Sequence, residues 1–436
     1  MAALKEKLYE KIQAWRPRTN DLLKNYGDVV VDNITVSQVI GGMRGVKSLV
    51  TDISYLDPNE GIRYRGYTLP EVFEKLPKPK DGTMPYVEGL FYLLLTGDVP
   101  NKKEVGEVVD EFSKRRIVPR YIYELIDAFP CCSHPMTIFS SAVATMSRES
   151  FFVKRYIAGM NKVDYWDSTY EDALNLLAKL PEIAAYIYSK KYRDGKRIVS
   201  NPNLDMGGNF AHMMGKEKPY DDVTRMNFII HSDHESGNVS AHSGHLVASS
   251  LSDVYLSISA MLNGLAGPLH GLANQEVLRW IQELKEKMGG ELPTEEELKK
   301  LVWEMLNAGQ VIPGYGHAVL RKTDPRYTVQ REFSLQHLKD DELFKYVDLL
   351  YKVVPPILRE QGKAKNPWPN IDSQTGVLQW HYGVTEYDFY PVLFGIGRSI
   401  GILSNIIWDR ALGYPLERPK SITTEMLEEI VRKSKK

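Results

Sequence analysis

Apolar residues recur at intervals of three and four along most of the chain, which is the spacing of amphipathic helices. One clear stripe is formed by Leu298, Leu301, Val302, Met305 and Leu306. Two further stripes occupy residues 174–187 and 343–354, and residues 390–412 are apolar on most faces. The first three patterns predict helices with one buried face, whereas the last predicts a helix buried on all sides.

Polar and special residues mark the ends of these predicted helices. Residues 294–297 (TEEE) have the form of a capping box, and Gly309 is typical of the position just beyond a helix. Residues 168–171 (STYE) have the same capping form, so we expect a helix to begin there. The proline pair at 355–356 is expected to end the helix that covers residues 343–354, because proline lacks a backbone N–H.

Strand signals are scarce. Residues 29–31 (VVV) and 62–64 (IRY) are the candidates for short strands or a hairpin. No segment alternates strands with helices, and no repeat of 20–50 residues is visible, so the sequence predicts an all-α fold. Residues 253–265 are rich in Ser, Ala and Gly, which let helices pack closely, either inside the core or at a dimer interface.

Length and charge narrow the class of protein. The 436 residues are enough for two domains, or for one large domain with an inserted lobe. Hydrophobic content of 43% and charged content of 25% are typical of a soluble globular protein. The formal net charge is −1 and no block of like charges occurs, so nothing indicates a nucleic-acid surface.

The only two cysteines are the neighbours Cys131 and Cys132. Adjacent cysteines have poor geometry for a disulfide, and so few cysteines are typical of a reducing compartment. We therefore expect an intracellular protein in which this pair packs in the core. No apolar run reaches the ~18–20 residues of a membrane span, the closest being residues 246–265.

The first twenty residues do not have the pattern of a targeting segment. They contain Glu6 and Glu10 and no apolar centre, unlike a secretory signal. They are also unlike the acid-poor, Ser-rich pattern of an organellar transit peptide. These features favour the cytoplasm, and the alternative is the mitochondrial matrix after removal of a presequence.

Two histidines lie in glycine-rich turns. His270 belongs to residues 267–271 (GPLHG), and His317 belongs to residues 313–318 (PGYGHA). Because glycine lacks a side chain, such turns allow a ligand to approach the backbone closely. Asp372 ends a stiff segment that reads PWPNID. Two imidazoles and a carboxylate on tight loops are the parts of an acid–base site.

Four more histidines fall within fifteen residues: His231, His234, His242 and His245. The pairs His231/His234 and His242/His245 have H-x-x-H spacing, which would place both rings of a pair on one helix face, so a zinc site is one interpretation. No cysteine or H-E-x-x-H pattern supports it. We favour an alternative in which one or two of these histidines line an anion pocket and the rest are structural.

Residues 395–401 (GIGRSIG) resemble a dinucleotide-binding fingerprint. The preceding strand and the following acidic residue of a βαβ unit are missing, so we interpret the glycines as room for a ligand or a helix beside Arg398. Arg326 and Arg418, like Arg398, lie in apolar or proline-bounded settings. Arginine binds carboxylates bidentately, although each of these residues could instead form a structural ion pair.

Taken together, these motifs resemble those of citrate synthase. In chain order they are residues 231–235 (HSDHE), 267–274 (GPLHGLAN), 311–317 (VIPGYGH), 365–372 (KNPWPNID) and 415–421 (PLERPKS). The likeness extends from residues 41–44 (GGMR) to the C-terminus. It is greatest to the dimeric form that is typical of mitochondria.

The resemblance implies a mostly helical homodimer that acts as a citrate (Si)-synthase. A large domain (residues 1–271 and 384–436) would hold an inserted small domain (272–383), which rotates to close the cleft. The reaction would join acetyl-CoA to oxaloacetate through an enol or enolate, and then hydrolyse citryl-CoA to citrate and CoA. No cofactor is implied, because acetyl-CoA is a substrate, and neither a metal, a nucleic acid nor a membrane is implied as a partner.

The resemblance also implies roles for individual residues. Asp372 would remove a methyl proton from acetyl-CoA, His270 would stabilise the thioester oxygen, and His317 would polarise the ketone of oxaloacetate. Oxaloacetate and citrate would be held by His234, Arg326, Arg398 and Arg418. Arg418 would reach across from the partner subunit.

Contacts with CoA are implied for a larger set. They are Arg44, Lys162, Val311, Ile312, Pro313, Gly314, Tyr315, Gly316, Ala318, Arg321, Lys365 and Asn370. Lys162 departs from the arginine of the family, and loses the bidentate fork while keeping the charge. Gly397 and Ser399, which flank Arg398, are a second departure.

Several alternatives stay open from sequence. A 2-methylcitrate synthase would use propionyl-CoA, and one methylene changes selectivity by only about 1–3 kcal/mol. The enzyme could also run towards citrate cleavage. A non-catalytic helical dimer would be expected to lose a catalytic residue, and a four-histidine metalloprotein would contain zinc. An ATP-dependent lyase is disfavoured, because the chain lacks a G-x-x-x-x-G-K-[ST] loop.

Overall fold

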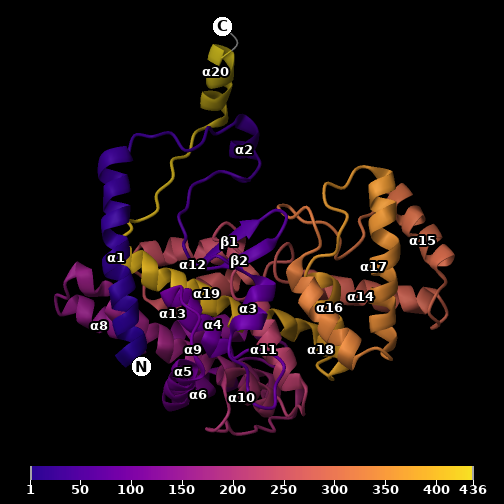
Figure 1. Ribbon diagram of the computed structural model, residues 1–436, viewed down its shortest axis with the longest axis horizontal. Coiled ribbons are helices and arrows are strands. Elements are labelled where there is room, and N and C mark those ends of the chain that lie inside the picture. The colour runs from indigo at the N-terminus through magenta and orange to yellow at the C-terminus, as the bar shows by residue number, and fades with distance from the viewer. Residues whose placement is uncertain (1, 435–436) are drawn as a thin grey trace.

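The computed structural model describes residues 2–434, and helices dominate it (Figure 1). The first ten helices are α1 (Ala2–Tyr26), α2 (Val36–Ile40), α3 (Leu69–Lys75), α4 (Val87–Thr96), α5 (Lys102–Arg115), α6 (Arg120–Ala128), α7 (Pro135–Thr145), α8 (Phe151–Ile157), α9 (Tyr165–Tyr192) and α10 (Met206–Met213). The next ten are α11 (Tyr220–His231), α12 (Val239–Ser249), α13 (Val254–Leu265), α14 (Ala273–Lys287), α15 (Glu295–Asn307), α16 (Pro325–His337), α17 (Glu342–Gln361), α18 (Asp372–His381), α19 (Tyr390–Leu412) and α20 (Thr424–Ser434). Three short 3-10 helices are η1 (Met146–Glu149), η2 (Lys162–Asp164) and η3 (Tyr387–Phe389).

One small antiparallel sheet interrupts the helices. It contains β1 (Ser54–Asp57), β2 (Gly61–Tyr64) and β3 (Tyr67–Thr68) in that order. The predicted strand at residues 62–64 is therefore confirmed as part of β2. The prediction for residues 29–31 is wrong, because this segment is exposed and, within residues 2–434, pairs with no strand.

The centre of the larger helical group is α19, which packs against α9, α11 and α13. Its side chains are buried almost throughout, as its apolar composition predicts. Among the described residues, one helix, Tyr387–Leu412, is long and apolar enough to cross a membrane, but 94% of its apolar window is buried inside the protein. The expectation that residues 246–265 come closest to a span is wrong, since they divide into parts of α12 and α13.

Glycines on α19 explain this close packing. A Cβ on Gly397 would lie 2.9 Å from the Phe228 carbonyl oxygen, and a Cβ on Gly401 would overlap the carbonyl oxygen of Ser232. The end of α11 and the residues after it therefore press directly onto α19. The glycines serve helix packing beside Arg398, as the sequence interpretation proposed, rather than nucleotide binding.

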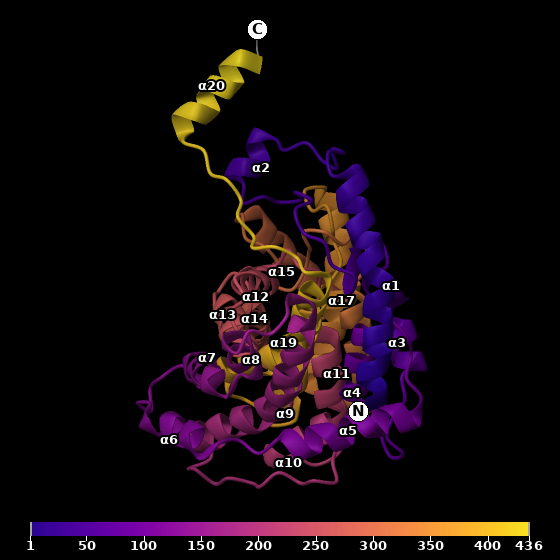
Figure 2. The ribbon, with the colours of Figure 1, turned by 90° about the vertical axis from the view of Figure 1, so that its left-hand side faces the viewer.

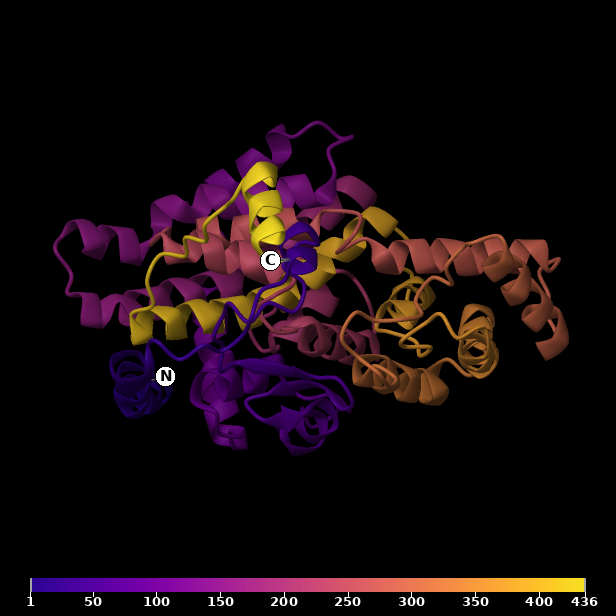
Figure 3. The ribbon, with the colours of Figure 1, turned by 90° about the horizontal axis from the view of Figure 1, so that it is seen from above.

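A second group of helices, which we call the α14–α18 lobe, stands at the right of Figure 1 and of Figure 3. Within it α14 packs on α17 and α18, and α15 packs on α17. The proline pair at 355–356 does not end α17, which continues to Gln361 and stops at Gly362 in the left-handed conformation. Buried residues on both sides of the prolines, including Val354 and Ile357, keep this helix packed despite two missing N–H donors.

Helix ends test the capping predictions. Thr294 caps α15 in a complete capping box, and Gly309 follows it with φ of +75°, as predicted. The predicted start at Ser168 is wrong, because α9 begins at Tyr165. The 3-10 helix η2 leads directly into α9, so Ser168 is already inside the helix and is buried.

Two further predictions concern packing. The small residues at 253–265 form α13, which Asp253 caps and which packs against α12 and α7 as a core helix. Cys131 and Cys132 are exposed free thiols in the turn between α6 and α7, so the expectation of core packing is wrong. A short turn between helices leaves both side chains outside the core.

Two arms project from the helical body. Figures 1 and 2 show α2 and α20 standing away from the other helices. The N-terminal arm, residues 20–50, and the C-terminal arm, residues 415–434, are exposed along most of their length. The beginning of α1, by contrast, is anchored in the core through Leu4, Leu8 and Ile12.

Candidate active site

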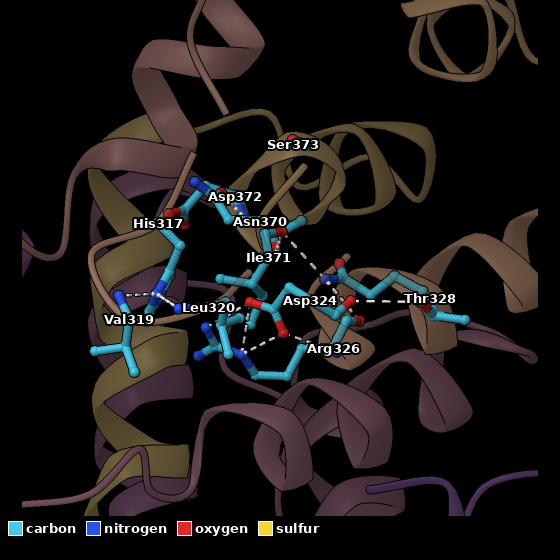
Figure 4. Close-up of polar contacts among 12 residues, drawn as sticks. His317, Val319, Leu320, Asp324, Arg326, Thr328, Asn370, Ile371, Asp372 and Ser373 are labelled. Atoms are coloured by element: carbon cyan, nitrogen blue, oxygen red, sulfur yellow. Dashed lines mark hydrogen bonds and ion pairs between the residues drawn. The ribbon is translucent and has the colours of Figure 1, made fainter. Parts of the chain in front are cut away.

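The predicted acid–base residues converge where the α14–α18 lobe meets the larger group. His317, Arg326 and Asp372 come from the lobe (Figure 4), whereas His234 follows α11 and His270 follows α13. The rings of His234 and His317 meet edge to face, with centroids 5.4 Å apart. The fold therefore joins segments that are far apart in the sequence.

His317 is held in one tautomer. Its Nδ1 accepts hydrogen bonds from the backbone N–H groups of Val319 and Leu320, both at 3.0 Å. The ring proton of the neutral imidazole must then be on Nε2, which makes that atom a donor. Burial lowers the pKa of His317 to about 4, and the positive charge of Arg326 adds to the effect.

His270 lies in the turn after α13 and faces α12. Its Nε2 is 2.8 Å from the Ser240 hydroxyl. Burial, followed by the charge of Arg398, lowers the pKa of His270 to about 4. The ring is therefore neutral at pH 7, and it can donate a hydrogen bond without carrying a charge.

Arg398 is buried on α19 and is held by several neutral acceptors. Its Nε donates to the His231 carbonyl at 2.9 Å, and its Nη1 donates to Asn238 Oδ1 at 2.8 Å and to Ser240 Oγ at 3.2 Å. The guanidinium also lies over the Phe394 ring, 4.8 Å from its centroid. Within residues 2–434 no carboxylate forms an ion pair with Arg398, so its charge is available to an anionic ligand.

Arg326, at the start of α16, has a carboxylate partner. Its Nη2 donates to Asp324 Oδ2 at 2.6 Å, and both residues are buried. Burial acts against ionisation, but the Arg326 charge holds the pKa of Asp324 below its ordinary value. The pair fixes the direction of the guanidinium (Figure 4).

Asp372 begins α18, and its environment makes it a stronger base. Its backbone N–H donates to Asn370 Oδ1 at 2.9 Å. Removal from water raises the pKa of the Asp372 carboxyl to about 6, with Arg326 opposing the shift. A carboxylate with this pKa holds a proton more strongly than an ordinary aspartate, and it is still largely ionised at pH 7.

Backbone bonds fix the loop of His317 against the loop of Asp372. The Gly316 N–H donates to the Trp368 carbonyl at 3.0 Å, and the Asn370 N–H donates to the Gly314 carbonyl at 2.9 Å. Gly314 has φ of +80°, and a Cβ there would lie 3.0 Å from the Cα of Ser373. Glycine is therefore required for the two loops to lie this close.

His234 presents an unpartnered nitrogen. The ring is buried, and its Nε2 has no hydrogen-bond partner among the described residues. Burial and the nearby charge of Arg326 lower its pKa well below the ordinary value. A buried neutral ring with an unsatisfied nitrogen, close to Arg326 and Arg398, suits a polar ligand.

Comparisons with known proteins agree with this geometry. The sequence model described as "Citrate synthase, C-terminal domain" matches residues 42–420. "Citrate synthase, mitochondrial" from Daucus carota is 54% identical over 432 residues, which cover 99% of this chain and 91% of that protein.

The chain belongs to the citrate synthase family.

"Citrate synthase 4, mitochondrial" from Arabidopsis thaliana is 53% identical over the same shares of both chains. The crystal structure of citrate synthase from Pyrobaculum aerophilum has a TM-score of 0.77 and 27% identity, over 88% of this chain and 92% of that chain. The predicted family, the all-α fold and the citrate (Si)-synthase reaction are confirmed. Citrate synthases need no cofactor, because acetyl-CoA is a substrate.

The other residues expected of a citrate synthase divide into two sets. The 311–318 loop, Arg321, Lys365 and Asn370 lie in or beside the two loops that carry His317 and Asp372. Arg44 is exposed on the N-terminal arm, Lys162 is exposed on η2, and Arg418 is exposed on the C-terminal arm. The structure of the single chain does not bring these three to the catalytic loops.

The histidine cluster does not form a metal centre. His242 Nε2 contacts Glu417 at 3.2 Å, and His245 Nδ1 contacts Asp409 at 2.9 Å. Among the described residues, no group of three or more His, Cys, Asp or Glu side chains could hold a metal ion. This arrangement gives no support to the metalloprotein alternative, and it agrees with one histidine in a ligand site beside structural ones.

Sequence reasoning missed the residues that orient the site. Ser240 and Asn238 hold Arg398, Ser240 also contacts His270, and Asp324 holds Arg326. The Asp-Pro-Arg run of Asp324 to Arg326 offered a signal, since an aspartate before proline is typical of a helix cap. Ser240 offered none, because its partners are 30 and 158 residues away.

Proposed function

We propose that these converging residues perform the condensation of acetyl-CoA with oxaloacetate in this chain. The observation that carries the proposal is the pairing of two loops, one with a His317 tautomer that donates from Nε2 and one with Asp372 at a pKa of about 6. A neutral donor and a strengthened base next to each other are what enolisation followed by carbon–carbon bond formation requires.

In the first step Asp372 takes a proton from the methyl group of acetyl-CoA. The thioester oxygen becomes negative as the proton leaves, and a donor aimed at it stabilises the enolate. His270 fills this role if its proton is on Nδ1. The Ser240 hydroxyl holds that tautomer when it donates its single proton to His270 Nε2 at 2.8 Å in place of Asn238 Oδ1 at 2.9 Å.

In the second step the enol carbon attacks the ketone of oxaloacetate. His317 donates from Nε2 to the ketone oxygen and then transfers its proton to the new alkoxide. The pKa of about 4 means that His317 is neutral at pH 7, so the transferred proton is the one on Nε2 and an imidazolate remains. The backbone N–H groups of Val319 and Leu320, which donate to Nδ1, stabilise this anion until it is protonated again. Hydrolysis of citryl-CoA then releases citrate and CoA.

Oxaloacetate carries two carboxylates, and we propose cations for both. Arg398 and Arg326 supply buried guanidinium groups, and His234 supplies the unpartnered Nε2. Arg418 completes the set from the partner subunit. Several fixed donors around a water-excluded anion hold it in one orientation, which is the geometric part of catalysis.

For CoA we propose the backbone of the 311–318 loop, with Arg321, Lys365 and Asn370 beside it. Arg44 and Lys162 would contact the phosphates. Because Lys162 is on η2, beside Gly413 at the C-terminal end of α19, we propose that it serves the site of the partner subunit, as Arg418 does. Its ammonium provides charge but only a single-point contact with phosphate.

We also propose the domain boundaries that the resemblance implied, with residues 272–383 as a small domain inserted between 1–271 and 384–436. The grouping of α14–α18 supports this division. Rotation of the small domain would break and re-form the contact between His317 and His234, and its closed position would exclude water from the enol.

A homodimer is supported by apolar residues that the single chain leaves exposed on its arms. On the N-terminal arm they include Leu22, Leu23, Tyr26, Val30, Val31, Ile34, Ile40 and Val50. On the C-terminal arm they are Leu416, Ile422, Met426 and Ile430. Exposed apolar surface of this extent is typical of an interface, and a second copy of the chain would cover it.

For location we propose the mitochondrial matrix. The relatives from Daucus carota and Arabidopsis thaliana are named mitochondrial, which supports this alternative over the cytoplasm expected from the N-terminal composition. Immunolabelling of fractionated cells tests the proposal, and recovery of the protein in the cytosolic fraction alone would contradict it.

The deciding assay measures release of the CoA thiol, dependent on oxaloacetate, with acetyl-CoA and propionyl-CoA side by side. Faster release with acetyl-CoA supports citrate synthesis in this chain. Preference for propionyl-CoA would instead indicate 2-methylcitrate synthesis. Absence of release with both would contradict the catalytic roles proposed for His270, His317 and Asp372.

A further inference from the structure

The tip of the β1–β2 hairpin touches the α14–α18 lobe. The Arg321 backbone N–H donates to the Pro58 carbonyl at 2.7 Å. Gly61, the first residue of β2, faces Pro325 so closely that a Cβ on Gly61 would overlap Pro325 Cγ and Cδ. Pro325 and Arg326 are adjacent, so the hairpin contacts the segment that carries an oxaloacetate-binding arginine.

The other end of the same hairpin is fixed beside His234. Ser54 Oγ donates to Asp233 Oδ2 at 2.8 Å, and the Tyr64 hydroxyl contacts the Asp233 carbonyl oxygen at 3.1 Å. The Asp233 carboxylate also accepts the His234 backbone N–H at 2.9 Å. Ser54, Tyr64 and Asp233 are all buried, so this end of the hairpin is rigid.

We infer that the β1–β2 hairpin is a positioning element that sets the distance between His234 and the Arg326 segment. Its base holds the loop of His234, and its tip is the stop against which Pro325 rests. This inference rests on the proposed function in one respect: the arrangement with Pro325 against Gly61 is the one that binds oxaloacetate. The residues involved act through His234 and Arg326 and are not expected to touch the substrate.

The turn at the tip of the hairpin is held by its own hydrogen bonds, which do not involve the α14–α18 lobe. The Asp57 carboxylate accepts the backbone N–H groups of Asn59 at 2.7 Å and Glu60 at 2.9 Å. Gly61 follows with φ of +85°, a conformation that glycine adopts without strain. A rigid turn loses little entropy when the lobe meets it, so the contact favours one defined distance.

Gly66 offers a matched control within the same sheet. It also has positive φ, +89°, but a Cβ there would meet nothing within 4 Å. Gly61→Ala and Gly66→Ala therefore introduce the same kind of backbone strain, while only the first places an atom between the hairpin and Pro325. The difference between the two variants isolates the contact with the lobe.

The experiment measures the oxaloacetate dissociation constant of full-length wild-type, Gly61→Ala and Gly66→Ala proteins by calorimetry, together with Tm. We expect Gly61→Ala to weaken binding by about 10- to 100-fold relative to Gly66→Ala, since the loss of a hydrogen bond to a charged group such as Arg326 has effects of this size. We expect Gly61→Ala/Pro325→Ala to recover most of the loss, because the proline ring that blocks the new methyl is gone. Equal binding by both single variants overturns the inference.

A second variant guards against misfolding. If Gly61→Ala lowers Tm more than Gly66→Ala does, Asp57→Ala is measured in its place. This substitution loosens the turn without adding an atom, and we expect it to bind oxaloacetate several-fold more weakly than wild type. Unchanged binding by Asp57→Ala then overturns the inference. Binding is measured apart from turnover, so a wild-type chain that binds oxaloacetate but releases no CoA would contradict the proposed chemistry and leave the hairpin comparison valid.

Discussion

At the scale of single residues, burial sets the protonation of the site. The three histidines His234, His270 and His317 are held neutral, because their rings are removed from water beside arginines. The same loss of water makes Asp372 a better base but a costly anion. Burial of Asp372 therefore lowers the stability of the folded protein, while it makes this residue a stronger base than free aspartate.

Asp372→Asn tests both the role of Asp372 as a base and its cost in stability. Turnover should fall by roughly 10²- to 10⁴-fold, the usual contribution of a general base, while oxaloacetate binding stays nearly intact. The folded pKa of about 6 lies above the unfolded value, so the wild type loses stability as pH rises from about 4 to about 6, and the full cost is present above that. At pH 8 the variant should therefore be more stable than wild type by about 1–3 kcal/mol.

Single-turnover kinetics, calorimetry with oxaloacetate and urea denaturation at pH 5 and pH 8 measure these quantities. The stability gain should be smaller at pH 5 than at pH 8, and it should disappear only below about pH 4, where the carboxyl is protonated in both the folded and the unfolded chain. Weakened oxaloacetate binding with preserved turnover would contradict the assignment of Asp372 as the base.

The pH dependence of turnover gives a separate test. Asp372 must be ionised to accept a proton, so kcat/KM for acetyl-CoA should fall on the acidic side with an apparent pKa near 6. His270 and His317, with pKa values near 4, stay neutral across this range and should add no step between pH 5 and pH 8. A rate that is independent of pH down to 4.5 would contradict the raised pKa of Asp372.

Ser240→Ala tests how His270 is held. Loss of the hydroxyl leaves His270 Nε2 without its partner and removes one acceptor of Arg398, at a cost of about 1–3 kcal/mol. We expect kcat to fall by roughly 10- to 100-fold. Ser243→Ala is the control on the same helix, because Ser243 Oγ bonds only to backbone carbonyls of Ser240 and Ala260. Similar kcat values for both variants would contradict a role of Ser240 in orienting His270.

The sequence allowed prediction of the residues that stand in motifs, such as His317 in its glycine-rich turn. It did not allow prediction of Ser240, Asn238 or Asp233. Their roles arise from contacts between α12, α19 and the β1–β2 hairpin, which depend on the tertiary arrangement. Local spacing determines turns and caps, whereas the neighbours of a buried hydroxyl depend on how the helices pack.

At the scale of elements, α19 and α11 form the framework beneath Arg398. Their close approach requires the absence of side chains at Gly397 and Gly401. Gly395 faces a side chain instead, since a Cβ there would lie 2.5 Å from Leu262 Cδ2, the end of a flexible residue. The three glycines therefore tolerate substitution to different degrees.

We expect Gly401→Ala to be much more destabilising than Gly395→Ala. The added methyl at 401 meets the Ser232 backbone, which cannot rotate away, whereas Leu262 can change rotamer. Overpacking typically costs about 1–3 kcal/mol and more where backbone must move. Urea denaturation of both variants measures the difference. Equal stability of the two would show that α11 shifts on α19 without cost.

Helix existence was easier to predict than helix limits. The stripe at 298–306 and the cap at Thr294 agree on α15, because both signals are local. Pro355 and Pro356 wrongly predicted the end of α17, because the residues that flank them are buried and keep the helix packed. Ser168 wrongly predicted the start of α9, because the preceding η2 turn leads directly into the helix. Packing decides where a helix ends when local signals compete with it.

At the scale of the whole molecule, the single chain leaves its two arms uncovered. Arg418 and Lys162 are exposed, away from the catalytic loops, and apolar residues line both arms. The motifs could be predicted to share one site, but spacing along a chain contains no distances between segments. The assignment of Arg418 to a second subunit therefore rests on resemblance alone. A test of that assignment must use two different chains in one dimer.

Mixed dimers provide this test. Arg418→Ala alone should lower kcat/KM for oxaloacetate by roughly 10²- to 10³-fold, because a buried carboxylate loses its partner. Asp372→Asn alone should be nearly inactive. When the two variants are unfolded together and refolded, half of the dimers contain one chain of each kind.

In such a heterodimer, the Arg418→Ala chain keeps its own Asp372 and receives Arg418 from the Asp372→Asn chain, so one of the two sites is complete. The mixture should therefore recover about one quarter of wild-type activity, since half of the dimers each hold one working site of two. If Arg418 served the site of its own chain, both sites of every heterodimer would lack a residue. No recovery, with heterodimers verified by mass spectrometry, would thus contradict the exchange of Arg418 between subunits.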